Sequence, residues 1–136
     1  MSYMDVLQKQ LVVDEGKRNK MYLDSKGIPS IGIGHNLRDN PLSDAAVNQI
    51  FADDVATLEG EVRKLFTFDE LTDNRKAVVL NMMFNMGYGT FSTFKHTIGL
   101  VNSGDYEGAA AAMLDSLWAG QVGDRAVRLA QLMKEG

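Results

Sequence analysis

The stretch DEGKRNKMYLDSKGIPSIGIGHN, residues 14–36, decides how the rest of this 136-residue chain is interpreted. Two of its acids, Glu15 and Asp24, lie nine positions apart, among several lysines and an arginine. A hydroxyl follows at Ser30, and then the glycine-framed run IGIGH, which ends at His35. Carboxylates, a hydroxyl, an imidazole and four glycines in so few residues suggest a site as well as a structure.

Local signals place this stretch between a helix and a ribbon. Apolar residues at helical spacing predict an amphipathic helix over residues 2–15, with Gly16 as its end. Gly27 and Pro29 break any further helix, and the isoleucines that follow favour extended backbone. We therefore expect a small β-hairpin or ribbon over residues 20–35.

Helical signals dominate the rest of the chain. Ser43 is a good N-cap for a long helix that should run to about Phe66. Thr72 can cap a second, almost wholly apolar helix, which Gly87 would end. Shorter helices are expected over residues 93–102, 106–114 and 124–134. The fold class is mainly α (α+β), with one small β element inserted early.

Composition excludes several classes of protein. A formal net charge of −4 argues against a nucleic-acid binder. The chain has no cysteine and only two histidines, His35 and His96, without an HExxH helix, so we expect no metal and no cofactor. Asp5 and Lys9 interrupt the apolar residues at the N-terminus, so no signal peptide is expected. No segment has the length of a membrane span.

The glycines and acids each allow more than one interpretation. Gly32 and Gly34 lack the third glycine or the lysine of a phosphate-binding loop, and a tight ribbon explains them better. Glu15 and Asp24 fit a glycosidase pair, which needs one protonated carboxyl and one carboxylate. The negative end of a helix favours the protonated form of Glu15. From spacing alone, two exposed acids, a structural histidine and a serine that bonds the turn remain the simpler interpretation.

Taken together, the motifs resemble the phage-type (T4-like) lysozyme family. The family signature is an acid and glycine at a helix end, a Tyr-x-Asp, a hydroxyl residue and IGIGH; here these are residues 15–16, 22–24, 30 and 31–35. Residues 75–87 are similar to the central buried helix of the family, and residues 117–129 to its tryptophan segment. The likeness spans nearly the whole chain.

The resemblance implies a single lysozyme-like domain over residues 1–136 with two lobes. Residues 16–42 would form the small β-containing lobe, and residues 43–66 the connecting long helix. Residues 1–15 and 67–136 would form the helical lobe.

It also implies a muramidase that cleaves the β-1,4 bond between N-acetylmuramic acid and N-acetylglucosamine in peptidoglycan and lyses bacteria. Glu15 would be the general acid, and Asp24 and Ser30 would position or activate water. Arg125 resembles the family arginine that pairs with the catalytic glutamate. The substrate-binding residues that the resemblance implies are His35, Asn36, Phe84, Asn85, Gln121 and Arg125.

The same resemblance implies peptidoglycan as partner, a monomer and no membrane insertion. An endolysin would wait in the host cytoplasm until a holin or similar pore admits it to the wall.

Three departures from the family pattern stand out. Ser30 replaces the usual threonine, the region between His35 and the long helix is shorter, and the net charge is acidic. Two alternatives stay open: a non-catalytic peptidoglycan-binding module, and a lytic transglycosylase, which uses one glutamate and no water nucleophile. The presence of both acids and the hydroxyl argues against each.

Overall fold

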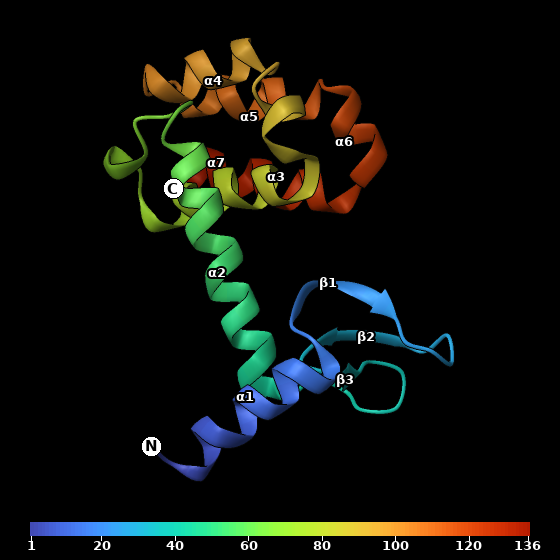
Figure 1. Ribbon diagram of the computed structural model, residues 1–136. Helices are drawn as coiled ribbons and strands as arrows, with labels where there is room; N and C mark the ends of the chain where they lie inside the picture. Colours follow the sequence, from blue (N-terminus) through green and yellow to red (C-terminus); the bar gives the residue numbers. More distant parts are fainter. The chain divides into compact units, whose positions relative to one another are not determined.

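The computed structural model describes all 136 residues, which divide into two units, Met1–Ile50 and Phe51–Gly136. The first unit contains helix α1 (Tyr3–Glu15) and strands β1 (Arg18–Leu23), β2 (Pro29–Gly32) and β3 (His35–Asn36) (Figure 1). Helix α2 (Asp44–Val62) begins in the first unit and continues into the second. The second unit adds the 3₁₀ turn η1 (Phe68–Glu70) and helices α3 (Asp73–Phe91), α4 (Lys95–Asn102), α5 (Tyr106–Leu114), α6 (Leu117–Val122) and α7 (Asp124–Glu135). The predicted fold class, mainly α with a small β element, is confirmed.

Helix α1 has defined ends. Ser2 and Asp5 form a capping box, in which the Ser2 hydroxyl accepts the Asp5 N–H and the Asp5 carboxylate accepts the Ser2 N–H. Gly16, with a φ of 81°, ends the helix and donates its N–H to the Val12 carbonyl. No residue of α1 is buried, and of its apolar side chains only Leu11 and Val12 are even partly covered.

The small sheet has the order β1-β2-β3, and both pairings are antiparallel. Tyr22 pairs with Ser30 and Arg18 with Gly32, so three residues of β1 face a single residue of β2 in a bulge. Ser30 also pairs with Asn36 in β3. The predicted ribbon is therefore present, with a short third strand that the sequence did not indicate.

Helix α2 starts as predicted and ends earlier. The Ser43 hydroxyl accepts the Ala46 N–H at 3.1 Å, which confirms the N-cap. The helix ends at Val62 and not near Phe66, because Lys64 and Leu65 donate to carbonyls only three residues back. This tighter winding directs Phe66 into the core, where it is 5% exposed.

The second unit contains the hydrophobic core. Every buried apolar side chain lies between Val62 and Met133. Helix α3 is capped at Thr72, as predicted, and contributes Val78, Val79, Met82 and Met83 to that core. Gly87, with a φ of 81°, interrupts the helix where its end was expected, although one more turn follows to residue 91.

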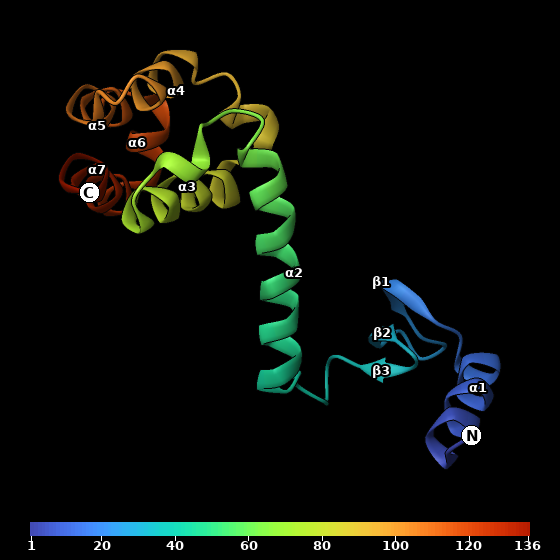
Figure 2. The same ribbon diagram turned by 90° about the vertical axis from the view of Figure 1, so that its left-hand side faces the viewer.

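Helices α4, α5, α6 and α7 complete the second unit (Figure 2). Helix α5 packs on α7 and α4, and α7 also packs on α3. Helix α5 has the predicted bounds, whereas α4 begins at Lys95, two residues later than expected. Helix α6 was not expected; the Ser116 hydroxyl caps it by accepting the Ala119 N–H. No helix of the chain combines the length and apolar character needed to cross a bilayer.

Candidate active site

Glu15 is the last residue of α1, and its side chain lies against the turn between β2 and β3. A Cβ atom placed on Gly34 would be 3.2 Å from the Cβ, Cγ and Oε2 atoms of Glu15. The residue is exposed overall. The end of the helix therefore presents this carboxyl to solvent beside a backbone that has no side chain at the point of contact.

Asp24 follows the end of β1, and the turn after it fixes its carboxylate. Its Oδ1 atom accepts the backbone N–H groups of Lys26 at 2.8 Å and Ile28 at 2.9 Å. Its own N–H donates to the Ile28 carbonyl, and its carbonyl accepts the Gly27 N–H. Because both side-chain bonds end on Oδ1, the Oδ2 atom is available to accept a hydrogen bond from water.

Ser30 is joined to Asp24 through one residue. Its hydroxyl donates to the Ile28 carbonyl at 3.2 Å, and the Asp24 N–H donates to the same oxygen. Ser30 is 3% exposed. Since its proton is already used within the turn, the hydroxyl oxygen can hold a water only as an acceptor.

His35 and Asn36 order the loop that follows the sheet. The His35 Nε2 atom lies 3.0 Å from the Asn40 carbonyl oxygen, which fits the tautomer with the proton on Nε2. The Asn36 side-chain oxygen accepts the N–H groups of Arg38 and Asp39, and its amide donates to the Asp39 carboxylate. A hydrogen bond from Arg38, and a weaker contribution from the Asn36 hydrogen bond, hold the pKa of Asp39 below its usual range.

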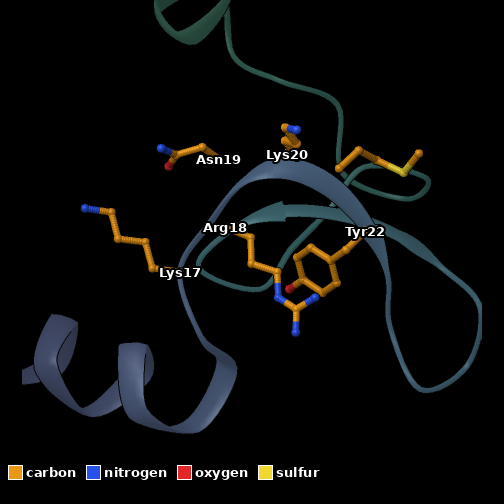
Figure 3. Close-up of a pocket in the computed structure, with 6 residues that line it drawn as sticks. Lys17, Arg18, Asn19, Lys20 and Tyr22 are labelled. Atoms are coloured by element: carbon orange, nitrogen blue, oxygen red, sulfur yellow. The ribbon is translucent and has the colours of Figure 1, made fainter.

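The strand between the two acids carries positive charge. Lys17, Arg18 and Lys20 line a surface hollow of about 500 Å³ formed by residues 17–22 (Figure 3). None of these three cations takes part in an ion pair, and the Arg18 guanidinium lies 4.6 Å from the centre of the Tyr22 ring. This edge of the sheet is suited to contact an anionic polymer.

In the second unit, Arg125 is held by a residue that the sequence analysis missed. Its Nε and Nη2 atoms donate to the Asn81 side-chain oxygen at 2.9 and 2.7 Å. Asn81 lies four residues before Asn85 on α3, which places both amides on one face of that helix. Two amides at this spacing in a largely apolar helix are the sequence signal that could have revealed it.

The other predicted residues of this unit lie on α3 and α6. The Asn85 side-chain oxygen accepts the Trp118 indole N–H at 2.7 Å. Trp118 is 5% exposed and packs in the core, whereas Phe84 is 62% exposed and Gln121 is exposed. Phe84 is thus a surface residue of this unit, although an apolar helix suggests a core position first.

A hollow of about 390 Å³ lies within the second unit, next to the Arg125–Asn81 pair. Most of its wall is apolar, and Arg125 and Asn81 supply its polar groups. It is lined by Phe51, Val55, Leu58, Ala77, Leu80, Asn81, Phe84 and Arg125. Such a wall suits a ligand with both apolar and hydrogen-bonding surfaces.

The predicted site residues thus fall into two groups. Glu15, Asp24, Ser30, His35 and Asn36 belong to the first unit, and Phe84, Asn85, Gln121 and Arg125 to the second. A free carboxyl on a helix end and a fixed carboxylate on a strand end are the groups that a carboxylate-based glycosidase requires.

Comparison with known proteins identifies the family. The phage lysozyme family model matches residues 13–133, and the chain belongs to that family, a class of glycosidases that act on peptidoglycan. The chain is 30% identical over 166 aligned positions to the pre-baseplate central spike protein Gp5 of Enterobacteria phage T4, with all of this chain and 28% of Gp5 covered.

Two further relatives are matched over most of their own length. A probable T4-type lysozyme 2 of Dictyostelium discoideum is 25% identical over 160 positions, covering 96% of this chain and 94% of the relative. The endolysin of Salmonella phage P22 is 31% identical over 115 positions, covering 77% of this chain and 75% of the relative. The alignments with Gp5 and the Dictyostelium protein are longer than this chain, so those relatives contain residues with no counterpart here.

Proposed function

We propose that this chain is an endo-acting muramidase that hydrolyses the β-1,4 bond between N-acetylmuramic acid and N-acetylglucosamine, and thereby lyses bacteria. The observation that carries the proposal is the contrast between its two acids in one unit. Glu15 ends a helix with its carboxyl open to solvent, and Asp24 has one oxygen fixed by two backbone N–H groups.

In the proposed reaction Glu15 is the general acid. Its proton passes to the glycosidic oxygen as the bond from that oxygen to the anomeric carbon breaks. Asp24 accepts, through Oδ2, a proton from the water that attacks the anomeric carbon from the opposite face. The product has inverted configuration, which requires roughly 6.5–9.5 Å between the two carboxyl groups to admit the water.

Ser30 has a supporting role in this scheme. Its hydroxyl shares the Ile28 carbonyl with the Asp24 N–H, so it braces the turn that orients the Asp24 carboxylate. Any water at Ser30 donates a hydrogen bond to it, since the hydroxyl proton is already used.

The other residues named above are proposed to bind the wall polymer. His35 and Asn36 order the loop beside the acids, and Phe84, Asn85, Gln121 and Arg125 contact sugar or the peptide stem. Asn81 supports Arg125 by fixing its guanidinium through two hydrogen bonds.

We also propose the route by which the protein meets its substrate. It is made in the host cytoplasm, reaches the wall through a holin or similar pore, and acts there as a monomer. The one domain is proposed to have the lobe boundaries given by the family resemblance, with residues 1–15 joining residues 67–136.

The test is clearing of purified Gram-negative peptidoglycan, with reducing ends counted. Glu15→Gln should abolish clearing, because the amide has the same shape and cannot give up a proton to the leaving oxygen. Asp14→Asn is the matched control, since it removes the neighbouring acid of the same helix end and should leave clearing intact.

Three outcomes would contradict the proposal. Full clearing by Glu15→Gln would remove Glu15 from the chemistry. A folded parent that pellets with the wall without releasing reducing ends would be a binding module. Products with 1,6-anhydro ends would identify a lytic transglycosylase.

A further inference from the structure

The turn between β2 and β3 contains two glycines in the same unusual backbone conformation. Ile31 pairs with His35, which leaves Gly32, Ile33 and Gly34 as the turn. Gly32 and Gly34 each have a φ of 68°, in the left-handed region that residues with a side chain rarely adopt. Backbone conformation alone would thus explain both glycines equally well.

The surroundings of the two glycines are different. A Cβ atom on Gly32 would meet no atom within 4 Å, whereas one on Gly34 would lie 3.2 Å from three atoms of Glu15. Carbon atoms in ordinary contact are about 3.5–4.0 Å apart. A methyl group at Gly34 would therefore displace Glu15, and a methyl group at Gly32 would not.

The displacement could not be relieved by side-chain rotation alone. One of the three close atoms is the Glu15 Cβ, which is bonded directly to the backbone of α1. Either the end of α1 or the turn itself would have to move by a few tenths of an ångström. The carboxyl would move with it, because Oε2 is among the atoms in contact.

We propose that Gly34 is a positioning residue for the general acid: because glycine has no side chain, the Glu15 carboxyl can pack directly against the backbone of the turn at residues 32–34. The proposal rests on the function proposed above for Glu15 and adds the group that sets its place. Gly34 itself touches no reacting atom.

This role predicts a specific kinetic effect. Misplacing a catalytic group by about 1 Å can cost roughly a hundredfold in rate, so a shift of a few tenths should cost about tenfold. The loss should fall mainly on kcat, since four of the six groups proposed to bind the polymer belong to the second unit. KM should stay within about a factor of two.

The experiment compares Gly34→Ala with Gly32→Ala, which carries the same backbone cost and no contact with Glu15. Turnover and KM are measured on soluble peptidoglycan fragments. The carboxyl ¹³C resonance of Glu15 is recorded in the full-length protein, with Glu15→Gln used to assign it. We expect kcat about tenfold lower in Gly34→Ala than in Gly32→Ala, and a changed Glu15 resonance only in Gly34→Ala.

Equal kcat losses in the two variants, or an unchanged Glu15 resonance in Gly34→Ala, would overturn the proposal. If either alanine variant fails to fold, the pair Gly34→Asn and Gly32→Asn replaces it, because asparagine tolerates the left-handed region best among residues with a side chain. Full activity of Glu15→Gln would defeat the proposed function instead, and the resonance would still report whether Gly34 seats the Glu15 side chain.

Discussion

Asp24 has a structural role in its turn and a proposed role in the chemistry, and one pair of substitutions should separate the two. Its Oδ1 atom accepts two backbone N–H groups in the turn, while the proposed chemistry uses the charge and the Oδ2 atom. Asp24→Asn keeps an oxygen that can accept both N–H bonds and removes the charge. Asp24→Ala removes the bonds and the charge together.

The structure gives the expected magnitudes. The two bonds reach an exposed amide, Lys26, and a half-buried one, Ile28, so each should contribute about 0.5–1.5 kcal/mol. Since about 1.4 kcal/mol corresponds to a factor of ten, hydrogen exchange at these two amides should be roughly two- to tenfold faster in Asp24→Ala. In Asp24→Asn the exchange should stay near that of the parent.

Activity should follow a different pattern from exchange. Loss of a positioned base typically costs about 100-fold or more, so both variants should lose at least that much reducing-end release. The assay is hydrogen exchange followed by NMR, beside reducing-end counting on the same samples. Parental activity in Asp24→Asn would refute the reasoning, because it would leave Asp24 as a turn residue only.

Three other predictions concern the rest of the chain. The Arg75 guanidinium donates to two carbonyl oxygens at the end of α7 and lies 3.6 Å from the centre of the Tyr106 ring. In denaturant titrations, Arg75→Ala should therefore lower the free energy of unfolding by about 2–3 kcal/mol, and Arg75→Lys should lower it by less. The hydrogen bond from Arg38 lowers the pKa of Asp39 in the folded protein. The order that the Asp39 carboxylate gives the loop should therefore be present above the ordinary aspartate pKa of about 3.9 and be lost as the pH falls through the lower pKa of the folded state. NMR of the loop should show this change, and Asp39→Asn should abolish it. A fragment of residues 51–136 should keep its helical circular dichroism while the first fifty residues alone should not, because every buried apolar side chain lies in the larger fragment.

Sequence reasoning succeeded where the signal is local. A cap needs only a hydroxyl and the next three residues, so Ser43 and Thr72 could be assigned without a fold. Helix α5 was predicted with its observed bounds because Gly104 marks the break before it and residues 109–112 are all alanine; in the structure the Asp105 carboxylate caps it by accepting the Gly108 N–H. Helix α6 was missed because it has only six residues, too few for an apolar period to show.

The candidate site shows where sequence reasoning fails, because its contacts join residues that are far apart in the chain. Arg125 and Asn81 are 44 residues apart, and Glu15 and Gly34 are 19 apart, so only the folded chain brings each pair together. The sequence predicted which residue types could form the candidate site. It could not tell Gly34, which contacts Glu15, from Gly32, which has the same φ and no neighbour.

Gp5 and the Dictyostelium protein contain residues that have no counterpart in this chain, and this difference raises the question of which kinetic constant it should affect. The groups proposed for the chemistry lie within residues 15–36, and each has a short-range contact there: Gly34 with Glu15, and Ile28 with both Asp24 and Ser30. None of these contacts depends on a residue outside that stretch. A deletion outside residues 15–36 would leave these contacts in place, so its cost should appear in KM rather than in kcat.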